Sequence, residues 1–193
     1  VYREQVVQDI LNHWDKTSSG ALSAGKREKN VFQAMLAVSG KQAVVHYYNL
    51  FKEKAPHLRV AMTFSRDESN QPGTKEQNEA LKKAIKEYSS CFNVPSLLNA
   101  QEPARAYMID ITKRLARKKP YNQGKDEDRL DLVIVSDQLL TGFDSKYINT
   151  IYMDKQLREG MLIQAMSRTN RTFHLNSKPH GKVRFYRQGE QLK

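Results

Sequence analysis

Leu132-Val133-Ile134-Val135, followed by the polar pair Ser136-Asp137, is the clearest buried strand in the sequence. Four consecutive apolar residues, three of them β-branched, indicate a strand that is covered on both faces. Strands of this kind belong to parallel sheets, whose two faces are packed against helices. The stretch therefore favours an α/β domain, and the rest of the chain can be interpreted outward from it.

Other segments repeat the same pattern on both sides of this strand. Further apolar runs predict strands at residues 31–38, 60–64, 148–153 and 182–186. Apolar residues at helical spacing predict helices at residues 3–15, 41–54, 74–88, 104–118 and 160–172. Thr74 is the expected N-cap of the third helix, Pro120 is expected to end the fourth, and residues 16–30 are expected to be a linker or loop. Alternating strands and helices predict a three-layer α/β/α fold with a mainly parallel sheet.

Composition sets limits on the function. The chain has 193 residues, 39% of them hydrophobic, which is enough for a folded core. No apolar run is long enough to span a membrane, and the single cysteine excludes an internal disulfide. The net charge of +11 favours a polyanionic partner such as nucleic acid, the alternative being a solvated basic surface. The first residues show neither a starting methionine nor a signal peptide, so a fragment of a longer polypeptide is expected.

Polar residues follow three of the predicted strands. Ser39-Gly40-Lys41 follows the strand at 31–38, and Ser136-Asp137 with Thr141-Gly142-Phe143-Asp144 follows the strand at 132–135. The helix at 160–172 follows the strand at 148–153. In parallel α/β sheets, ligands bind at the loops that leave the carboxyl ends of the strands. The three clusters are therefore expected at one binding edge.

The octapeptide Gln164-Ala-Met-Ser-Arg-Thr-Asn-Arg171 places Gln164, Arg168 and Arg171 at i, i+4 and i+7 of a predicted helix. Residues at this spacing share one helical face. Two guanidinium groups on one face can hold a phosphate bidentately, and arginine keeps its charge at any working pH. The pattern suits the γ-phosphate of a nucleoside triphosphate, the alternative being a solvated basic helix face.

These motifs resemble the second RecA-like motor domain of superfamily 2 helicases and translocases. The octapeptide resembles motif VI, with Ser167 where the family usually has glycine. The residues from Ser136 to Asp144 resemble motif V, and Val38-Ser39-Gly40-Lys41 occupies the place of motif IV. Leu140–Asp144 and Gln164–Arg171 are similar to the motor subunit of type I restriction enzymes in particular. The resemblance implies the RecA-like version of the P-loop NTPase fold.

The resemblance also implies roles for the residues of the predicted nucleotide site. Arg168 and Arg171 would reach a triphosphate bound on the partner motor domain, and Gln164 would order a phosphate or the attacking water. Asp144, beside Gly142, would contact the ribose or orient an arginine. From the sequence alone, Asp144 could equally be a turn or N-cap residue.

Four residues would contact the phosphates of double-stranded DNA by the same resemblance: Ser39, Lys41, Ser136 and Thr141. Contacts to phosphates position a protein on DNA without reading its sequence. Ser39 and Lys41 could also be an ordinary helix N-cap and first-turn residue. The histidines have no metal-ligand spacing, so no metal site is expected within the chain.

Parts of a complete motor are absent from the sequence. There is no G-x-x-x-x-G-K-[ST] loop, no Asp-Glu pair suited to magnesium after an apolar strand, and no nuclease motif. The resemblance therefore implies that ATP and Mg²⁺ are bound mainly by a first motor lobe, and that this chain alone hydrolyses almost no ATP. Residues 1–30 would be an N-terminal helix and linker, and residues 31–193 the second motor lobe, with a variable helical segment near 66–103.

The resemblance implies that the parent protein is a cytoplasmic, ATP-dependent type I site-specific deoxyribonuclease of a bacterium or archaeon. Its expected partners are double-stranded DNA, the first motor lobe and nuclease domain of the same chain, and the methyltransferase and specificity subunits. Two alternatives are the motor lobe of another superfamily 2 DNA or RNA helicase, and a non-catalytic nucleic-acid-binding module that uses only the basic charge.

Overall fold

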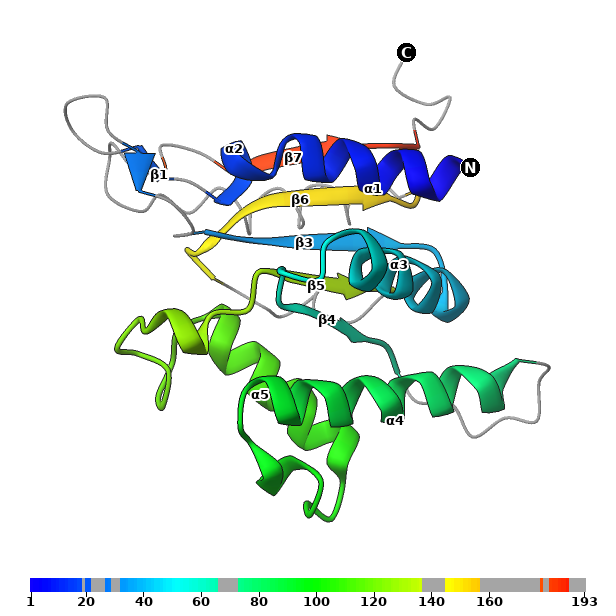
Figure 1. Cartoon of the computed structure of the whole chain (residues 1–193), viewed down its shortest axis with the longest axis vertical. Helices are drawn as coiled ribbons and strands as arrows, with labels where there is room; N and C mark the ends of the chain where they lie inside the picture. The colour runs from blue at the N-terminus through cyan, green and yellow to red at the C-terminus, as the bar shows by residue number, and fades with distance from the viewer. Residues whose placement is uncertain are drawn as a thin grey trace.

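A parallel β-sheet forms the centre of the molecule (Figure 1). The computed structural model describes residues 1–18, 32–65, 73–136, 145–156, 178 and 181–187, together with two short strands at 20–21 and 27–28. Within these residues five strands pair in the order β4-β5-β3-β6-β7, and every pairing is parallel. The strands are β3 (Gln33–Val38), β4 (Val60–Thr63), β5 (Leu132–Val135), β6 (Ile148–Asp154) and β7 (Lys182–Phe185). The short strands β1 (Gly20–Ala21) and β2 (Arg27–Glu28) pair antiparallel beside the sheet.

Strand β3 occupies the middle of the sheet. Ala34 pairs with Leu132 of β5 on one side and with Thr150 of β6 on the other. All residues of β3, β4, β5 and β6 are buried, as expected of strands covered on both faces, although Gln33, Asn149 and Asp154 among them are polar. The sheet flanked by helices confirms the predicted three-layer α/β/α RecA-like fold.

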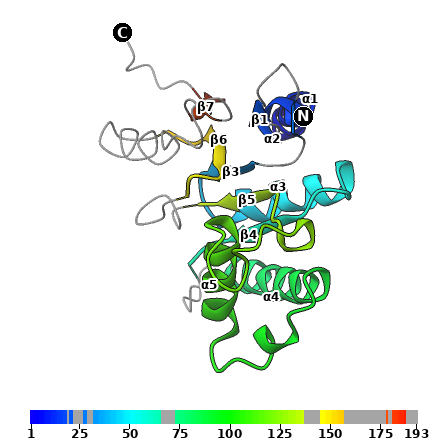
Figure 2. The same cartoon turned by 90° about the vertical axis from the view of Figure 1, so that its left-hand side faces the viewer.

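The helices differ in the part of the sheet that they cover. They are α1 (Tyr2–Asn12), α2 (Trp14–Ser18), α3 (Lys41–Lys54), α4 (Thr74–Cys91) and α5 (Pro103–Leu115), with single 3-10 turns η2 (Pro95–Leu97) and η3 (Asp126–Asp128). Helices α1, α2 and α3 lie on one side of the sheet, and α4 and α5 lie beyond the β4 edge (Figure 2). The Thr63 side chain lies on the face of β4 that points away from α3. Its hydroxyl is 4.0 Å from the sulfur of Met108 on α5.

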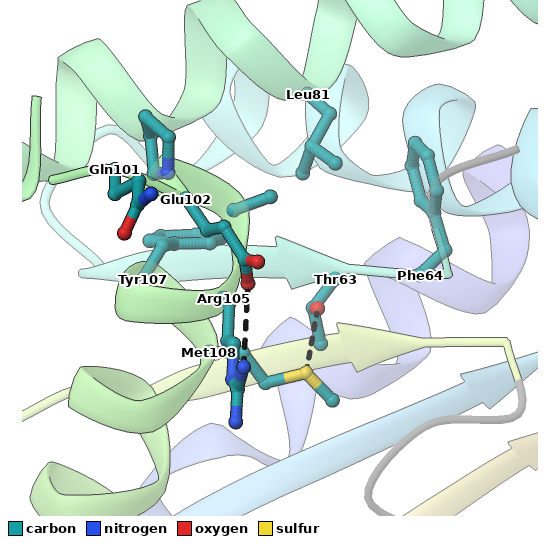
Figure 3. A pocket seen from close by; sticks show the side chains of 10 residues that line it. Thr63, Phe64, Leu81, Gln101, Glu102, Arg105, Tyr107 and Met108 are labelled. Carbon is teal, nitrogen blue, oxygen red and sulfur yellow. Dashed lines mark hydrogen bonds and ion pairs between the residues drawn. The ribbon is translucent and has the colours of Figure 1, made fainter. Parts of the chain in front are cut away.

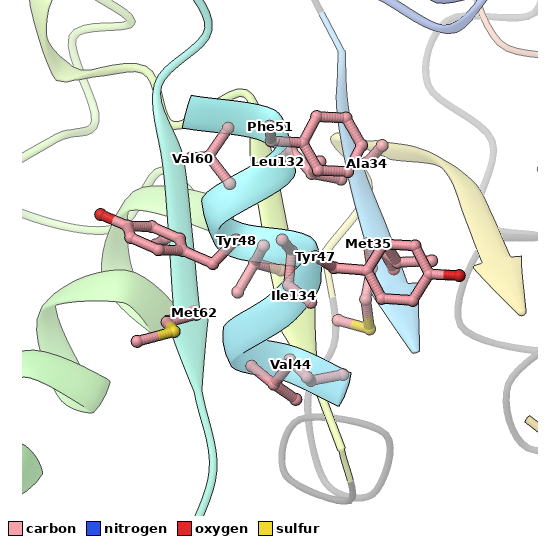
Figure 4. Close-up of a cluster of buried hydrophobic side chains, with 14 of the residues drawn as sticks. Ala34, Met35, Val44, Tyr47, Tyr48, Phe51, Val60, Met62, Leu132 and Ile134 are labelled. Carbon is pink, nitrogen blue, oxygen red and sulfur yellow. The ribbon is translucent and has the colours of Figure 1, made fainter. Parts of the chain in front are cut away.

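The core between α3 and the sheet is formed by side chains at helical spacing. Val44, Tyr47 and Phe51 of α3 are fully buried and point toward Ala34 and Ile134 on the strands (Figure 4). Burial of such a side chain stabilises the fold by about 1.5–3 kcal/mol. The aromatic side chains of α3 therefore belong to the core and offer no surface on which a base could stack.

The ends of two predicted helices are wrong, for reasons of backbone geometry. Thr74 is the first residue of α4 and not its N-cap, because Gly73 enters the helix with φ 83°, a left-handed conformation that glycine adopts readily. Helix α5 ends at Leu115, before the predicted stop at Pro120. Arg117 has φ 47°, and the Lys118 N–H closes the helix onto the Lys113 carbonyl at 2.9 Å.

The helical part of the N-terminal segment extends beyond residue 16, where the polar sequence predicted the start of a loop. The break predicted at 16–18 is wrong because α2 extends to Ser18, whose hydroxyl donates to the Trp14 carbonyl at 3.0 Å. The Thr17 hydroxyl is buried and lies 2.6 Å from the Tyr152 hydroxyl in β6. These internal partners replace water, so polar residues can be buried here at little cost.

Candidate functional site at the carboxyl edge of the sheet

Three chain segments leave the sheet side by side at its carboxyl edge. The register pairs Ala37 of β3 with Val135 of β5, and Val38 with Asp154 of β6. Ser39, Ser136 and Lys155 therefore follow the ends of three adjacent strands. The structure thus brings together the carboxyl ends of the three strands that precede the predicted motifs IV, V and VI in the sequence.

The turn after β3 presents its backbone and side chains to solvent. Ser39 and Gly40 are exposed and Lys41 is half-buried, with its Nζ 6.0 Å from the centre of the Phe64 ring. Gly40 has φ 82° and ψ 161°, a conformation almost confined to glycine, and it is the N-cap of α3. The alternative that Ser39 caps the helix is wrong, whereas Lys41 does stand in the first turn.

The N-terminus of α3 gives this edge the chemistry of an anion site. Its first backbone N–H groups have no partners within the helix, and the helix dipole makes this end positive. The Lys41 ammonium adds a full positive charge, and the Ser39 hydroxyl can donate a further hydrogen bond. Such a set of donors suits phosphate oxygens and carries no preference for a base.

Ser136 has a different environment from Ser39. It is 4% exposed, and its carbonyl oxygen accepts a hydrogen bond from Lys155 Nζ at 2.9 Å. Lys155 is itself 8% exposed. Of the described residues predicted to contact DNA, Ser39 and Lys41 are therefore the accessible ones in this structure, and the contact by Ser136 stays a prediction.

The Asp154 carboxylate gathers side chains from three other segments. Its Oδ2 accepts from the Tyr47 hydroxyl at 2.6 Å, and its Oδ1 accepts from the Tyr2 hydroxyl at 2.8 Å and from Arg187 Nε at 2.9 Å. Burial, and then the hydrogen bond to Asp154, raises the pKa of Tyr47. The hydrogen bond to Asp154 also raises the pKa of Arg187. Asp154 thus joins α1, α3 and the segment after β7 at the end of β6.

A cavity of about 460 Å³ opens near the end of β4, between α4 and α5 (Figure 3). Thr63, Phe64 and Leu81 contribute to its lining, and Glu102 and Arg105 form an ion pair at 3.4 Å in its wall. Both charged side chains are largely exposed, and such surface pairs contribute little to stability. The cavity lies beside the edge strand, outside the group of three adjacent strand ends.

The remaining predicted site residues lie outside the residues that the structure describes. These are Gln164, Arg168, Arg171, Thr141, Gly142 and Asp144. Within the described ranges, no group of three or more His, Cys, Asp or Glu side chains is arranged to hold a metal ion. No helix in the described part of the chain is long and apolar enough to cross a membrane.

Comparison with known proteins identifies the family to which this α/β chain belongs. The family model "Type I restriction enzyme subunit R domain 3" matches residues 30–188. The chain therefore belongs to the family of type I restriction enzyme R subunits, as domain 3 of that subunit.

Individual relatives agree with the family match. The chain is 30% identical over 192 residues to the type I restriction enzyme SauCOLORF180P endonuclease subunit of Staphylococcus aureus, covering 95% of this chain and 19% of that protein. It is 33% identical over 169 residues to the SsaAORF53P endonuclease subunit of Staphylococcus saprophyticus, covering 83% of this chain and 17% of that protein. The chain thus spans about a fifth of the length of these curated relatives.

Sequence reasoning gave no role to Asp154 and Lys155. Both are almost completely buried, at 1% and 8% exposed, although they are charged. Charged residues are seldom buried without partners. A signal was present in the sequence, since a charged pair directly follows the strand predicted at 148–153. Only the structure identifies the partners, which come from distant parts of the chain.

Proposed function

We propose that this chain is the second motor lobe of the ATP-dependent DNA translocase in a type I restriction subunit. The observation that carries the proposal is that β5, β3 and β6, the strands that precede the predicted motifs V, IV and VI in the sequence, are adjacent in one parallel sheet. Membership of the R-subunit family supports it. A motor needs its nucleotide-sensing and DNA-gripping residues on one rigid support, and the buried sheet supplies that support.

In this proposal, Arg168 and Arg171 reach across a cleft to the γ-phosphate of ATP on the partner lobe. An arginine in that role stabilises charge in the transition state and raises the rate of hydrolysis by about 10³–10⁵-fold. Gln164 orders a phosphate oxygen or the attacking water, and Asp144 beside Gly142 orients an arginine or binds the ribose. The arginines favour the closed cleft only while the γ-phosphate is present, because only then do they make a contact in the closed state that the open state lacks.

The donors of this edge fit a phosphate better than a metal ion. Ser39, Lys41 and the α3 N-terminus offer hydroxyl, ammonium and N–H groups, whereas Mg²⁺ prefers oxygen ligands, carboxylates above all. We therefore assign Mg²⁺ and the triphosphate cradle mainly to the first lobe. When bound, the metal would neutralise charge on the β- and γ-phosphates.

DNA binding is assigned to the loops after β3 and β5. Ser39, Lys41, Ser136 and Thr141 grip the phosphate backbone of double-stranded DNA, so that opening and closing of the cleft moves the lobe along the duplex. The net charge of +11 supports attraction to DNA at long range. We further propose that the complete subunit acts as an endonuclease together with methyltransferase and specificity subunits, and that this chain alone is inactive.

The test is Arg168→Ala and Arg171→Ala in the complete restriction subunit, assembled with its partners. DNA-stimulated ATP hydrolysis is expected to fall by about 10³-fold or more for the arginine that acts as the finger. Arg105→Ala is a matched control, because Arg105 is exposed and forms only a surface ion pair with Glu102. Near wild-type hydrolysis in both test variants would refute the assignment of the arginines.

A further inference from the structure

Lys155 makes a contact that joins two of the three segments at the carboxyl edge. Its Nζ donates to the Ser136 carbonyl oxygen at 2.9 Å. Strands β5 and β6 are not neighbours in the sheet, because β3 lies between them. The lysine side chain therefore spans the end of β3, close to where the chain turns away into α3.

The burial of Lys155 shows that this contact is a specific one. Lysine is among the residues least often buried, and its long stem usually allows the ammonium to reach water. Here the residue is 8% exposed and the ammonium is held at a backbone carbonyl. An apolar side chain of similar length would fill the same space without the cost of removing a charge from water. Packing alone thus gives no reason for a lysine at this position.

The acceptor is the peptide group through which the chain leaves β5. Because the peptide bond is planar, a hydrogen bond to the Ser136 carbonyl fixes the orientation of the whole peptide group that follows β5. In the sequence, the motif V residues 137–144 follow this peptide directly, and the motif VI residues 164–171 follow Lys155 by nine positions. One hydrogen bond therefore connects the residue that precedes motif V with the end of the strand that precedes motif VI in the sequence.

The backbone of Lys155 is held in place through the side chain of its neighbour Asp154. Hydrogen bonds from Tyr47, Tyr2 and Arg187 converge on the Asp154 carboxylate, and Tyr47 belongs to the helix that follows motif IV. The backbone at the end of β6 is therefore anchored to three other segments. A displacement of the Ser136 peptide would be resisted by this network through Lys155.

We propose that Lys155 is a positioning residue that couples the DNA-contacting residues of motif V to the ATP-sensing residues of motif VI. The proposal rests on the function proposed above, and it names the side chain by which DNA binding at one motif reaches the arginines of the other. Removal of the ammonium uncouples the two motifs, so that DNA still binds but no longer accelerates ATP hydrolysis.

The experiment compares Lys155→Met and Lys155→Arg in the complete, assembled restriction subunit. The measured quantity is the ratio of the ATPase rate with double-stranded DNA to the rate without it. Lys155→Met is expected to lower this ratio by about 10- to 100-fold, the range expected when catalytic groups shift by about 1 Å. DNA affinity is expected to change less than about 3-fold, because residues that contact phosphate are retained. Lys155→Arg keeps a charged donor and is expected to recover most of the stimulation.

A loss of stability alone must be distinguished from a loss of coupling. Tyr152→Phe serves as the control, because it removes a buried hydroxyl contact to Thr17 from the same strand without touching Lys155. It is expected to lower the thermal midpoint while leaving the stimulation ratio unchanged. If Lys155→Met does not assemble, Lys155→Gln removes the charge with a shorter polar side chain and is expected to give the same loss of ratio.

Two results would overturn the proposal. One is a wild-type stimulation ratio in Lys155→Met or Lys155→Gln, and the other is an equal loss of ratio in Tyr152→Phe. Arg168→Ala measured in parallel separates this inference from the proposed function. If Arg168→Ala loses ATP hydrolysis while Lys155→Met keeps the wild-type stimulation ratio, only the coupling role of Lys155 is refuted. If Arg168→Ala still hydrolyses ATP at the wild-type rate, the proposed function of Arg168 itself is refuted.

Discussion

Arg114 and Asp110 form an ion pair on α5, in which Nε donates to Oδ2 at 2.9 Å and the two side chains are 1% and 12% exposed. The guanidinium lies 4.0 Å from the centre of the Phe92 ring and 3.9 Å from that of Tyr121. The Tyr88 and Tyr121 hydroxyls donate to the same Asp110 carboxylate. This cluster holds α4, α5 and the following loop together beyond the edge of the sheet.

Arg114→Ala is expected to lower the free energy of unfolding by about 3–5 kcal/mol, because it removes a buried guanidinium and leaves the largely buried Asp110 carboxylate without its counter-charge. Urea unfolding followed by circular dichroism measures the change. Lys113→Ala alters the adjacent, exposed residue and is expected to change stability by less than about 0.5 kcal/mol. Equal midpoints for the two variants would show that the cluster does not stabilise the fold.

Tyr47→Phe tests the anchoring of α3 to the end of β6. The variant removes a 2.6 Å hydrogen bond to the buried Asp154 carboxylate and is expected to cost about 1.5–3 kcal/mol of stability. Tyr48→Phe is the matched comparison on the same helix, where the hydroxyl binds Glu87 at 2.8 Å. The Glu87 side chain is 33% exposed, so water can replace the lost partner and a smaller cost is expected. Equal costs in urea unfolding would contradict this difference in burial.

Lys41→Ala tests the DNA contact at the α3 N-terminus. In the complete restriction subunit, non-specific affinity for double-stranded DNA is expected to fall, and the slope of log K against log salt to decrease by about 1. Lys52→Ala is the control, because Lys52 lies in the last turn of the same helix and pairs with Glu87 at 3.6 Å. A titration at several salt concentrations distinguishes the two. An unchanged slope for Lys41→Ala would remove this residue from the DNA interface.

Alkaline pH is expected to destabilise the fold. Burial raises the pKa of Tyr47, Tyr88, Tyr107 and Tyr186 above the ordinary tyrosine value near 10. Above about pH 10 the unfolded chain therefore binds fewer protons than the folded chain, and the free energy of unfolding falls with rising pH. Below that pH the tyrosines are protonated in both states, so they do not make the free energy of unfolding depend on pH.

The measurement combines tyrosinate absorbance with circular dichroism during an alkaline titration. Ionisation of the buried tyrosines is expected to coincide with loss of helical signal, because their hydroxyls must reach water before they release protons. Smooth ionisation near the ordinary pKa, completed while the helical signal persists, would be inconsistent with the burial of these hydroxyls.

The sequence was sufficient to predict the five strands of the parallel sheet, but not the short strands β1 and β2 within the predicted linker at 16–30. Continuous apolar runs such as Leu132–Val135 have few alternatives, and the predicted helix at 41–54 has the same bounds in the structure. Helix ends were less predictable, because they depend on backbone conformation. The left-handed turn at Arg117 ends α5, although arginine carries no sequence signal for that conformation.

The partners of buried charges could not be predicted from local sequence. Tyr2 and Arg187 meet at Asp154 although they lie at opposite ends of the chain. Lys155 likewise donates to the carbonyl of Ser136, which follows β5, a strand that is not adjacent to β6 in the sheet. Spacing patterns describe one element at a time, whereas these contacts depend on how distant elements are stacked.

The central position of β3 has a consequence for synthesis of the chain. Both of its partners follow late in the sequence, since Ala34 pairs with Leu132 and Thr150. A ribosome that adds about 5–20 residues per second needs roughly 5–20 s to make the first partner after β3 has been made. During this interval the apolar strand has unpaired backbone groups and open faces, as in other aggregation-prone intermediates. A nascent chain of this protein is therefore expected to depend on chaperones until β5 and β6 have emerged.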